Sequence, residues 1–325
     1  MRTLLRIGFF VWLTCLTNGL TMASPAPPEI AKTVTFIFLA GDHGAPRVQN
    51  DAPVANGTGF FVLVENENGP GGYGYLVTAK HVLKDDKGDY FRRVFVRIND
   101  KKGGSALIPI DLVSSEARQN LFIHDDPTVD IAVVPALPDL NVFDFLAIPT
   151  ALIKSKEDFK KSTIAVGSDV FFAGLFAPHY GDKINTPIFR FGRVAMLTDD
   201  RIRWQEASKP VEMVELYLLE TMSFGGNSGS PVFFSQGADR QPGSIILGPP
   251  EITLAGVMRG NFNEPRVGGV IQTPNAVLPV FAQNIGIAAV TPAYLLREIL
   301  YSDRLKKMRA DNPVKVPEDQ PKKAE

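Results

Sequence analysis

Residues 225–233 read Gly-Gly-Asn-Ser-Gly-Ser-Pro-Val-Phe, a turn of small residues that leads directly into an apolar run. The small neighbours leave the Ser228 hydroxyl clear of bulky side chains and leave the adjacent backbone N–H groups free to donate hydrogen bonds. These are the properties of a nucleophilic serine. The same residues also fit a glycine-rich turn before a buried strand, which is a common connection between strands. The rest of the chain has to decide between the two interpretations.

The sequence on both sides of this stretch has the pattern of an all-β protein. Short runs rich in β-branched and aromatic residues alternate with clusters of Gly, Pro, Asn and Asp, which predicts strands separated by turns. In residues 94–98, Val and Ile alternate with Phe and Arg, so one face of this strand is expected to be buried. The other predicted strands cover residues 33–39, 60–64, 73–78, 130–134, 169–172, 187–191, 214–218, 231–234, 252–257 and 285–290.

The strands fall into two groups. Prolines punctuate residues 135–149, as expected for a connection between two lobes, and many short strands of regular spacing favour barrels or sandwiches. The predicted organisation is a first lobe, a connection, a second lobe, a helix and a charged, disordered tail, over residues 33–147, 148–165, 166–290, 291–309 and 310–325. The helix is predicted from an apolar stripe that consists of Leu295, Leu296, Ile299 and Leu300.

The amino-terminal residues have the pattern of an export signal. Arg2 and Arg6 precede an uncharged apolar segment at 7–16, and small residues follow. The sequence therefore predicts a signal peptide over residues 1–23. An uncleaved membrane anchor is the alternative, because no further charge occurs before Glu29, but polar residues dilute the apolar run below what a membrane span requires.

Composition limits the partners and cofactors. Removal of the signal would also remove Cys15, the only cysteine, so no disulfide is expected in the mature protein. We expect it to be periplasmic or extracellular in a bacterium, with no stable membrane association once the signal is cleaved. A balance of 34 basic and 35 acidic residues gives no broad electrostatic footprint for nucleic acid. No His and Cys cluster has metal-ligand spacing, so no metal and no cofactor are expected.

A serine nucleophile needs a base within hydrogen-bond reach and a carboxylate that orients the base. Of the four histidines, His81 closely follows a predicted strand, whereas the other three lie in polar loops. Alone, His81 would equally fit a surface position at the start of a helical turn. Asp130 directly precedes an apolar run, where a carboxylate has to be hydrogen-bonded. Asp125 and Asp126 remain alternatives for the carboxylate.

Three segments together carry a resemblance to a known family. Leu-Val-Thr-Ala-Lys-His at 76–81, Asp-Ile-Ala-Val at 130–133 and Gly-Asn-Ser-Gly-Ser-Pro at 226–231 resemble the signature segments of chymotrypsin-like (trypsin-like) serine proteases of the bacterial exported type. They occur in the order of that family, and the resemblance extends over about residues 33–300. It implies two six-stranded antiparallel β-barrels with a C-terminal α-helix. It also implies a serine endopeptidase that hydrolyses protein or peptide substrates through an acyl-enzyme.

The resemblance assigns a role to each site residue. Ser228 would attack the substrate carbonyl, His81 would move the proton and Asp130 would orient the imidazole. The backbone N–H groups of Gly226 and Ser228 would form the oxyanion hole.

The chain departs from the family pattern at two positions beside the nucleophile. Ser230 stands where a second glycine is usual. Asn227 replaces the aspartate that pairs with a newly cut N-terminus in digestive members, so this activation switch is not expected.

The resemblance also suggests where substrate side chains bind. Met222 stands where an aspartate confers cleavage after Arg or Lys, so that specificity is not expected. The predicted pocket would favour a modest apolar side chain, or an acidic one if its arginine attracts the substrate, and it consists of Met222, Ser223, Phe224, Val257, Met258 and Arg259. The alternative function is a catalytically inactive or regulated protease-like binding or scaffold protein that retains the triad.

Overall fold

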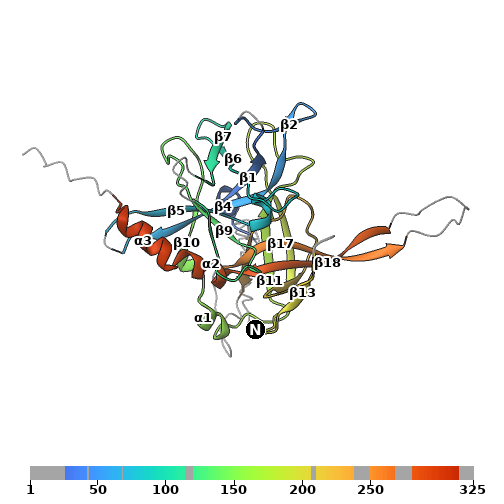
Figure 1. The fold of residues 1–325 in the computed structure, drawn as a ribbon. Coiled ribbons are helices and arrows are strands. Elements are labelled where there is room, and N and C mark those ends of the chain that lie inside the picture. The colour runs from blue at the N-terminus through green and yellow to red at the C-terminus, as the bar shows by residue number, and fades with distance from the viewer. Residues whose placement is uncertain are drawn as a thin grey trace, which may run out of the picture.

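Strands dominate the chain, and they form two lobes, as the all-β interpretation predicts (Figure 1). The computed structural model describes residues 26–41, 44–67, 69–113, 120–205, 210–237, 249–267 and 280–314. The predicted signal peptide at 1–23 and residues 315–325 of the predicted tail lie outside the described residues.

The first lobe is one eight-stranded sheet in which the path β7-β6-β1-β4-β5-β9-β8 is antiparallel and β10 pairs in parallel with β4. Its strands are β1 (Val34–Leu39), β4 (Ala55–Glu65), β5 (Gly72–Thr78), β6 (Arg93–Asn99), β7 (Ser105–Asp111), β8 (Phe122–Ile123), β9 (Ala132–Pro135) and β10 (Ala147–Pro149). Two 3₁₀ turns and a short hairpin accompany the sheet, namely η1 (Pro28–Thr33), η2 (Lys80–Leu83), β2 (Val48–Gln49) and β3 (Ala52–Pro53).

This sheet curls back on itself without being the simple ring of six strands that the resemblance implies. The backbone N–H of Asn120, just before β8, donates to the Leu112 carbonyl, just after β7, at 3.0 Å. The two ends of the strand path therefore lie close together. The additional strands β8 and β10 are two and three residues long, which is too short for an alternating pattern to reveal them.

The second lobe is a closed barrel with the strand order β11-β12-β15-β18-β17-β16, which confirms the six strands expected there. Its members are β11 (Asp169–Gly174), β12 (Ile188–Met196), β15 (Tyr217–Glu220), β16 (Pro231–Gln236), β17 (Glu251–Val267) and β18 (Val280–Pro292). A small hairpin beside it consists of β13 (Ile202–Trp204) and β14 (Glu212–Val214). Beyond the barrel, β17 and β18 continue as a two-stranded arm that projects from the body (Figure 1).

The connection and the C-terminus are more structured than predicted. Within residues 148–165, the chain completes β10 and then forms η3 (Thr150–Leu152) and α1 (Lys156–Lys160). The helix predicted over 291–309 begins later, because β18 runs to Pro292, and it is two helices, α2 (Ala293–Leu300) and α3 (Asp303–Asp311). Helix α3 includes the first two residues of the predicted tail. None of the described helices is long and apolar enough to cross a membrane.

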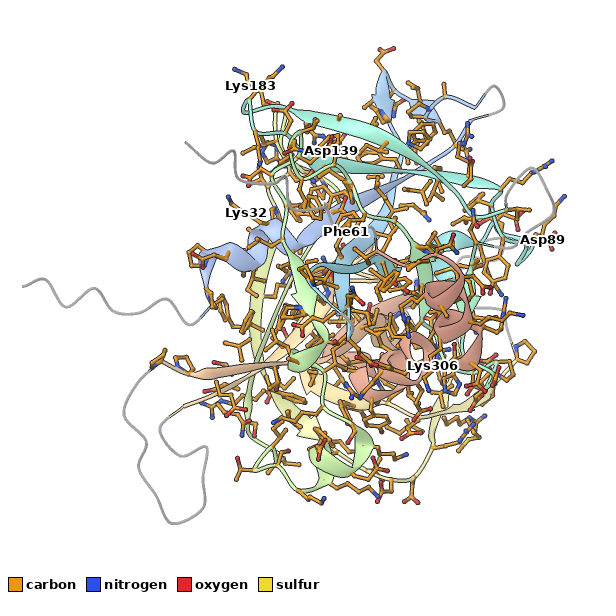
Figure 2. All side chains as sticks on the ribbon, turned by 90° about the vertical axis from the view of Figure 1, so that its left-hand side faces the viewer. Lys32, Phe61, Asp89, Asp139, Lys183 and Lys306 are labelled. Carbon is orange, nitrogen blue, oxygen red and sulfur yellow. The ribbon has the colours of Figure 1, made fainter. Side chains whose placement is uncertain are left out.

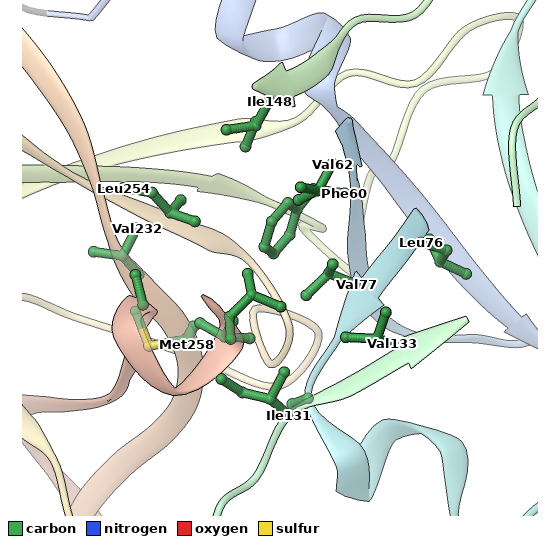
Figure 3. Packing of buried hydrophobic residues seen from close by; sticks show 14 of the residues in the cluster. Phe60, Val62, Leu76, Val77, Ile131, Val133, Ile148, Val232, Leu254 and Met258 are labelled. Carbon is green, nitrogen blue, oxygen red and sulfur yellow. The ribbon is translucent and has the colours of Figure 1, made fainter. Parts of the chain in front are cut away.

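The two lobes share one hydrophobic core. Figure 2 shows Phe61 inside the molecule and charged side chains such as Lys32 and Lys183 at its surface. In Figure 3, Val77 and Ile131 from the first lobe face Met258 from the second, and all three belong to a single cluster of buried residues. Because neither lobe can be separated without exposing this cluster, the segments at their junction are held in a fixed relative position.

A buried arginine adds polar contacts between the lobes. Arg97 on β6 is 7% exposed and donates from Nη1 to the Gly181 carbonyl at 2.7 Å and from Nη2 to the Asp182 carbonyl at 2.8 Å. Asn185 donates back from its side-chain nitrogen to the Arg97 carbonyl at 2.6 Å. The loop before β12 is thereby fastened to the first lobe.

The apolar stripe of α2 should carry part of the stability of the second lobe. Leu296 is fully buried, whereas Lys307 on α3 is exposed. We expect Leu296→Ala to lower the free energy of unfolding by about 3 kcal/mol, because it leaves a cavity in the core. Lys307→Ala is the matched control and should leave the unfolding midpoint in urea unchanged. Equal midpoints for the two variants would contradict the docking of α2.

Candidate active site

His81 and Asp130 are brought together by the pairing of β5 with β9. Thr78 at the end of β5 lies opposite Ala132 at the start of β9, so the residues just beyond these ends meet. The 3₁₀ turn η2 follows β5 and is anchored by Val82 and Leu83, which are buried. His81 Nδ1 lies 2.7 Å from Asp130 Oδ2, and the backbone N–H of His81 donates to Oδ1 at 3.0 Å.

Asp130 is a buried and oriented carboxylate. It is 3% exposed, whereas the side chain of His81 is 31% exposed and opens to solvent. Burial raises the pKa of Asp130, but the charge and hydrogen bonds of His81 and the charge of Arg259 outweigh it, so the pKa lies below its ordinary value. Asp130 is therefore ionised at neutral pH and can accept the Nδ1–H of a neutral imidazole.

The two alternative carboxylates have other surroundings. Asp125 is exposed. Asp126 accepts hydrogen bonds from the Thr128 N–H at 2.9 Å and the Thr128 hydroxyl at 2.7 Å, and it forms an ion pair with Arg201. Burial raises its pKa, yet these contacts lower it to about 2. Asp126 therefore shapes the loop that precedes Asp130.

Glycines allow the Ser228 loop to approach the histidine segment. A Cβ on Gly57 would lie 2.8 Å from Val82 and 3.1 Å from the Ser228 carbonyl oxygen. A Cβ on Gly229 would lie 2.3 Å from Thr78 Oγ1, and its φ of +85° lies in the left-handed region. Ser228 is thus placed against the residues that flank His81. Its hydroxyl donates to the Arg259 carbonyl at 3.2 Å.

The loop before Ser228 is fixed by Asn227, which is 2% exposed. Its side-chain oxygen accepts the Phe224 N–H at 2.9 Å, and its side-chain nitrogen donates to the Leu175 carbonyl at 2.8 Å. Gly226 has a φ of +96°, which favours glycine. Within the part of the chain that the structure describes, the N–H groups of Gly226 and Ser228 donate to no other group.

Thr58 on β4 joins the Ser228 loop to the first lobe through hydrogen bonds that the sequence did not reveal. Its hydroxyl donates to the Gly226 carbonyl at 2.7 Å and accepts the Leu175 N–H at 2.9 Å, while its own N–H donates to the Ser228 carbonyl at 2.9 Å. Thr58 is fully buried. The one sequence signal for this role is its place between two glycines, Gly57 and Gly59, where the backbone of another segment can come close.

Ser230, the departure from the family pattern, is accommodated by a glycine on another strand. It is fully buried, and its backbone donates to the Asn227 carbonyl at 3.0 Å and accepts the Met258 N–H at 2.9 Å. A Cβ on Gly174 at the end of β11 would lie 2.0 Å from Ser230 Oγ. The missing side chain at 174 therefore leaves the space that the extra hydroxymethyl group occupies.

Part of the predicted specificity pocket forms a groove. Met222 and Phe224 are about half exposed and lie with the buried Ser223 along a groove of about 540 Å³. The remaining described lining residues are Gly225, Asn261, Asn263 and Asn284. Asn284 donates from its side chain to the Ser223 carbonyl at 2.6 Å, which ties β18 to the segment before the nucleophile. None of these described lining side chains carries a charge.

The predicted wall of this pocket lies elsewhere. Val257 and Met258 are fully buried in the shared core, and Figure 3 shows Met258 facing Ile131. Arg259 lines a different cleft of about 110 Å³, next to His81 and Asp130. Consecutive strand residues point to opposite faces, and Val257 and Met258 are both buried because β17 is covered on both faces at this point.

The described residues contain no group of three or more His, Cys, Asp or Glu side chains that could hold a metal ion. The site is composed of a buried carboxylate, an imidazole, a hydroxyl and two backbone donors. With these groups it can support proton transfer and nucleophilic attack by an oxygen.

A protein-family model and several solved structures match this chain. The trypsin-like peptidase domain model matches residues 57–238, a span that contains His81, Asp130 and Ser228. No curated protein matches the chain. Among solved structures, the chain is similar to the active form of the Rv3671c protease from M. tuberculosis, with 16% identity over 83% of this chain and 80% of that chain and a TM-score of 0.40. It is also similar to human heparin binding protein, with 11% identity over 90% and 97% of the two chains and a TM-score of 0.43.

The matched span covers more than half of the 325 residues and includes strands from both lobes. The chain therefore belongs to the trypsin-like peptidase family, which hydrolyses peptide bonds.

Proposed function

We propose that this protein is a serine endopeptidase that uses Ser228, His81 and Asp130 as a catalytic triad. The observation that carries the proposal is the hydrogen bond of 2.7 Å between His81 and the buried Asp130, with the Ser228 loop packed against the residues that flank His81. Fixed geometry among a carboxylate, an imidazole and a serine is what activates a hydroxyl that is otherwise a weak nucleophile.

The reaction begins with attack of Ser228 Oγ on the substrate carbonyl carbon. The hydroxyl, which donates to the Arg259 carbonyl in this structure, rotates about its Cα–Cβ bond and donates to Nε2 of His81. His81 takes the proton as the C–O bond forms, and Asp130 stabilises the resulting imidazolium through Nδ1–H. Burial of Asp130 keeps water from competing for this hydrogen bond.

The backbone stabilises the negative charge that develops on the carbonyl oxygen. The N–H groups of Gly226 and Ser228 donate to this oxygen, and each such donor lowers the barrier by about 3 kcal/mol. The loop that carries these donors is held by Thr58 at the Gly226 carbonyl and by Asn227 at the Phe224 N–H. The Asn227 carbonyl, which shares a peptide group with the Ser228 N–H, accepts the Ser230 N–H at 3.0 Å. Little reorganisation is then needed as the charge develops.

The tetrahedral intermediate collapses when His81 gives its proton to the leaving amine. The C–N bond breaks, the amine departs and the acyl group stays on Ser228 Oγ as an ester. A water molecule then attacks the ester carbonyl, His81 takes its proton, and the acid product leaves as Ser228 regains a hydrogen.

The groove suggests a neutral side chain next to the cleaved bond. Met222 and Phe224 supply apolar contact on one side, and Asn261, Asn263 and Asn284 supply polar groups without charge on the other. A charged substrate side chain would lose hydration there without gaining an ionic partner from the described lining residues.

The place of action that we propose is outside the cytoplasm. Residues 1–23 would direct export and be removed, and the catalytic unit would consist of the two lobes, proposed as residues 33–147 and 166–290, with the C-terminal helices packed on them. The protein and peptide substrates would then be those of the periplasm or of the medium.

A second candidate is a regulated or inactive protease-like binding protein. The observation that favours it is the donation of the Ser228 hydroxyl to the Arg259 carbonyl at 3.2 Å. If this bond persisted when a substrate binds, the hydroxyl proton would not reach His81 and the cleft would bind peptides without cleaving them.

Covalent labelling separates the two candidates. We expect a fluorophosphonate probe to label the mature protein at Ser228, because only an activated serine reacts with it. Ser228→Ala should abolish both labelling and peptide cleavage with the fold intact by circular dichroism. Ser235→Ala, a half-buried serine on β16, is the control and should retain both. A folded protein that takes up no label would contradict the endopeptidase proposal.

Removal of the Thr58 hydroxyl tests the oxyanion loop. Thr58→Val keeps the shape of the side chain but leaves the Gly226 carbonyl and the Leu175 N–H without their shared partner. We expect kcat to fall by about 100-fold with little change in KM, since the loss concerns the transition state. Thr58→Ser restores the hydroxyl and should recover most of the rate. Equal rates for the valine and serine variants would show that this hydroxyl has no part in positioning the loop.

The groove can be tested with a peptide library. The wild-type protein should cleave after neutral residues. Met222→Asp places a carboxylate at the groove, so cleavage after Lys and Arg should increase at least about tenfold relative to cleavage after Leu, the gain expected from one charge pair in a partly exposed site. Met222→Asn is the control of equal size without charge. An unchanged library profile in both variants would place the specificity pocket elsewhere.

A further inference from the structure

Arg259 contacts two members of the proposed triad at once. Its carbonyl oxygen accepts the Ser228 hydroxyl at 3.2 Å. Its side-chain Nε lies 4.0 Å from Asp130 Oδ2, the same oxygen that lies 2.7 Å from His81 Nδ1. The carboxylate of Asp130 is therefore shared between an imidazole and a guanidinium.

The guanidinium is held rigidly in this position. Nη1 donates to the Thr128 carbonyl at 2.8 Å, and Nη2 donates to Glu212 Oε2 at 3.3 Å. The guanidinium carbon lies 5.2 Å from the ring centre of Trp204, and Arg259 is 6% exposed. These partners come from both lobes, so the position of the charge is fixed by the fold and not by a flexible surface contact.

Other charged and titratable groups also face the dyad. Lys80 on η2 and Lys84 just after η2 line the cleft together with His81, and Glu212 on β14 lines the same cleft. The ammonium nitrogen of Lys84 lies over the Tyr90 ring, 4.8 Å from the ring centre. Burial lowers the pKa of Lys80, although the charge of Asp130 opposes this shift. Arg259 differs from both lysines because its side chain also forms an ion pair with Asp130, at 4.0 Å between Nε and Oδ2.

We propose that Arg259 is a positioning residue that, by sharing the Asp130 carboxylate with His81, shifts the active range of the protein toward lower pH. The proposal rests on the function proposed above. An anionic Asp130 favours the imidazolium form of His81, and a cation beside Asp130 weakens that preference. His81 is then neutral, and able to accept the serine proton, at a lower pH than it would be without Arg259.

Glu212 should act in the opposite direction. Its carboxylate neutralises part of the guanidinium charge, but about half of its side chain is exposed, so solvent screens the effect. Removal of Arg259 and removal of Glu212 should therefore shift the pH dependence of activity in opposite directions. Removal of the cation should raise the pH at which activity appears, and removal of the acid should lower it slightly.

The experiment compares the acid limb of kcat/KM against pH in four variants. Arg259→Met should move the acid limb to higher pH by about one unit, and Arg259→Lys should move it by less, since the charge is retained. Glu212→Gln should move it to lower pH by roughly 0.3 unit. Arg203→Met, which removes an exposed arginine next to Trp204, is the control and should leave the limb in place.

A second measurement distinguishes failure of this proposal from failure of the proposed function. The ring protons of His81 can be titrated by NMR in the Ser228→Ala background, where no turnover is needed. Adding Arg259→Met to this background should raise the midpoint by the same amount as the acid limb, and adding Arg259→Lys should raise it by less. This result supports the proposal even for a protein that does not cleave peptides. An unmoved midpoint, or a shift of the opposite sign, in folded Arg259→Met and Arg259→Lys overturns it.

Discussion

The hydroxyl of Thr58 is the point at which the two lobes and the nucleophile loop meet. It donates to the Gly226 carbonyl and accepts the N–H of Leu175, which directly follows β11. Thr58 itself lies on β4, which pairs with β5, the strand that leads to His81. Because Thr58 is fully buried, each of these contacts is made without competing water, and loss of one partner would leave a buried polar group unsatisfied. The geometry of the proposed oxyanion hole is thus set by a residue of the opposite lobe.

The glycines on either side of Thr58 make this arrangement possible. Gly57 lets the Ser228 carbonyl and Val82 approach β4 to a distance at which a side chain would collide. Gly59 does the same for Leu76 on the neighbouring strand. At these two glycines, neighbouring side chains and the Ser228 carbonyl pack directly against the backbone of β4, so the position of β4 is coupled to the segments of His81 and Ser228.

The sequence was sufficient to predict those strands and helices that follow from a local pattern of residues. Alternation and β-branched runs located most strands, and the apolar stripe of α2 is buried as predicted. Strands β7, β8 and β10 were not predicted. Strands β8 and β10 are only two and three residues long and show no period, and β7 contains Pro109, which argues against a strand. The break at Tyr301 between α2 and α3 lies inside a continuous helical composition. The charged tail was assigned from composition, which does not report that α3 extends to Asp311.

The site could be predicted from the sequence where its residues stand at the ends of predicted strands. His81 and Asp130 were identified in this way, and register brings them together. The roles of Thr58 and Arg259 depend on contacts between residues more than 100 positions apart, which no local pattern contains. Arg259 was expected at the surface of a substrate pocket, yet its side chain lies beside the carboxylate, because the cleft next to Asp130 offers it a carbonyl, an acid and an indole ring.

Gly174 and Ser230 together limit which residues this site can accept. The serine hydroxymethyl group occupies the space where a side chain at 174 would be. With Ser230 in place, a side chain at 174 would have to displace Ser230 or the turn that carries Ser228. The choice of residue at 174 is therefore coupled to the choice at 230, although Gly174 lies at the end of β11 and Ser230 directly precedes β16.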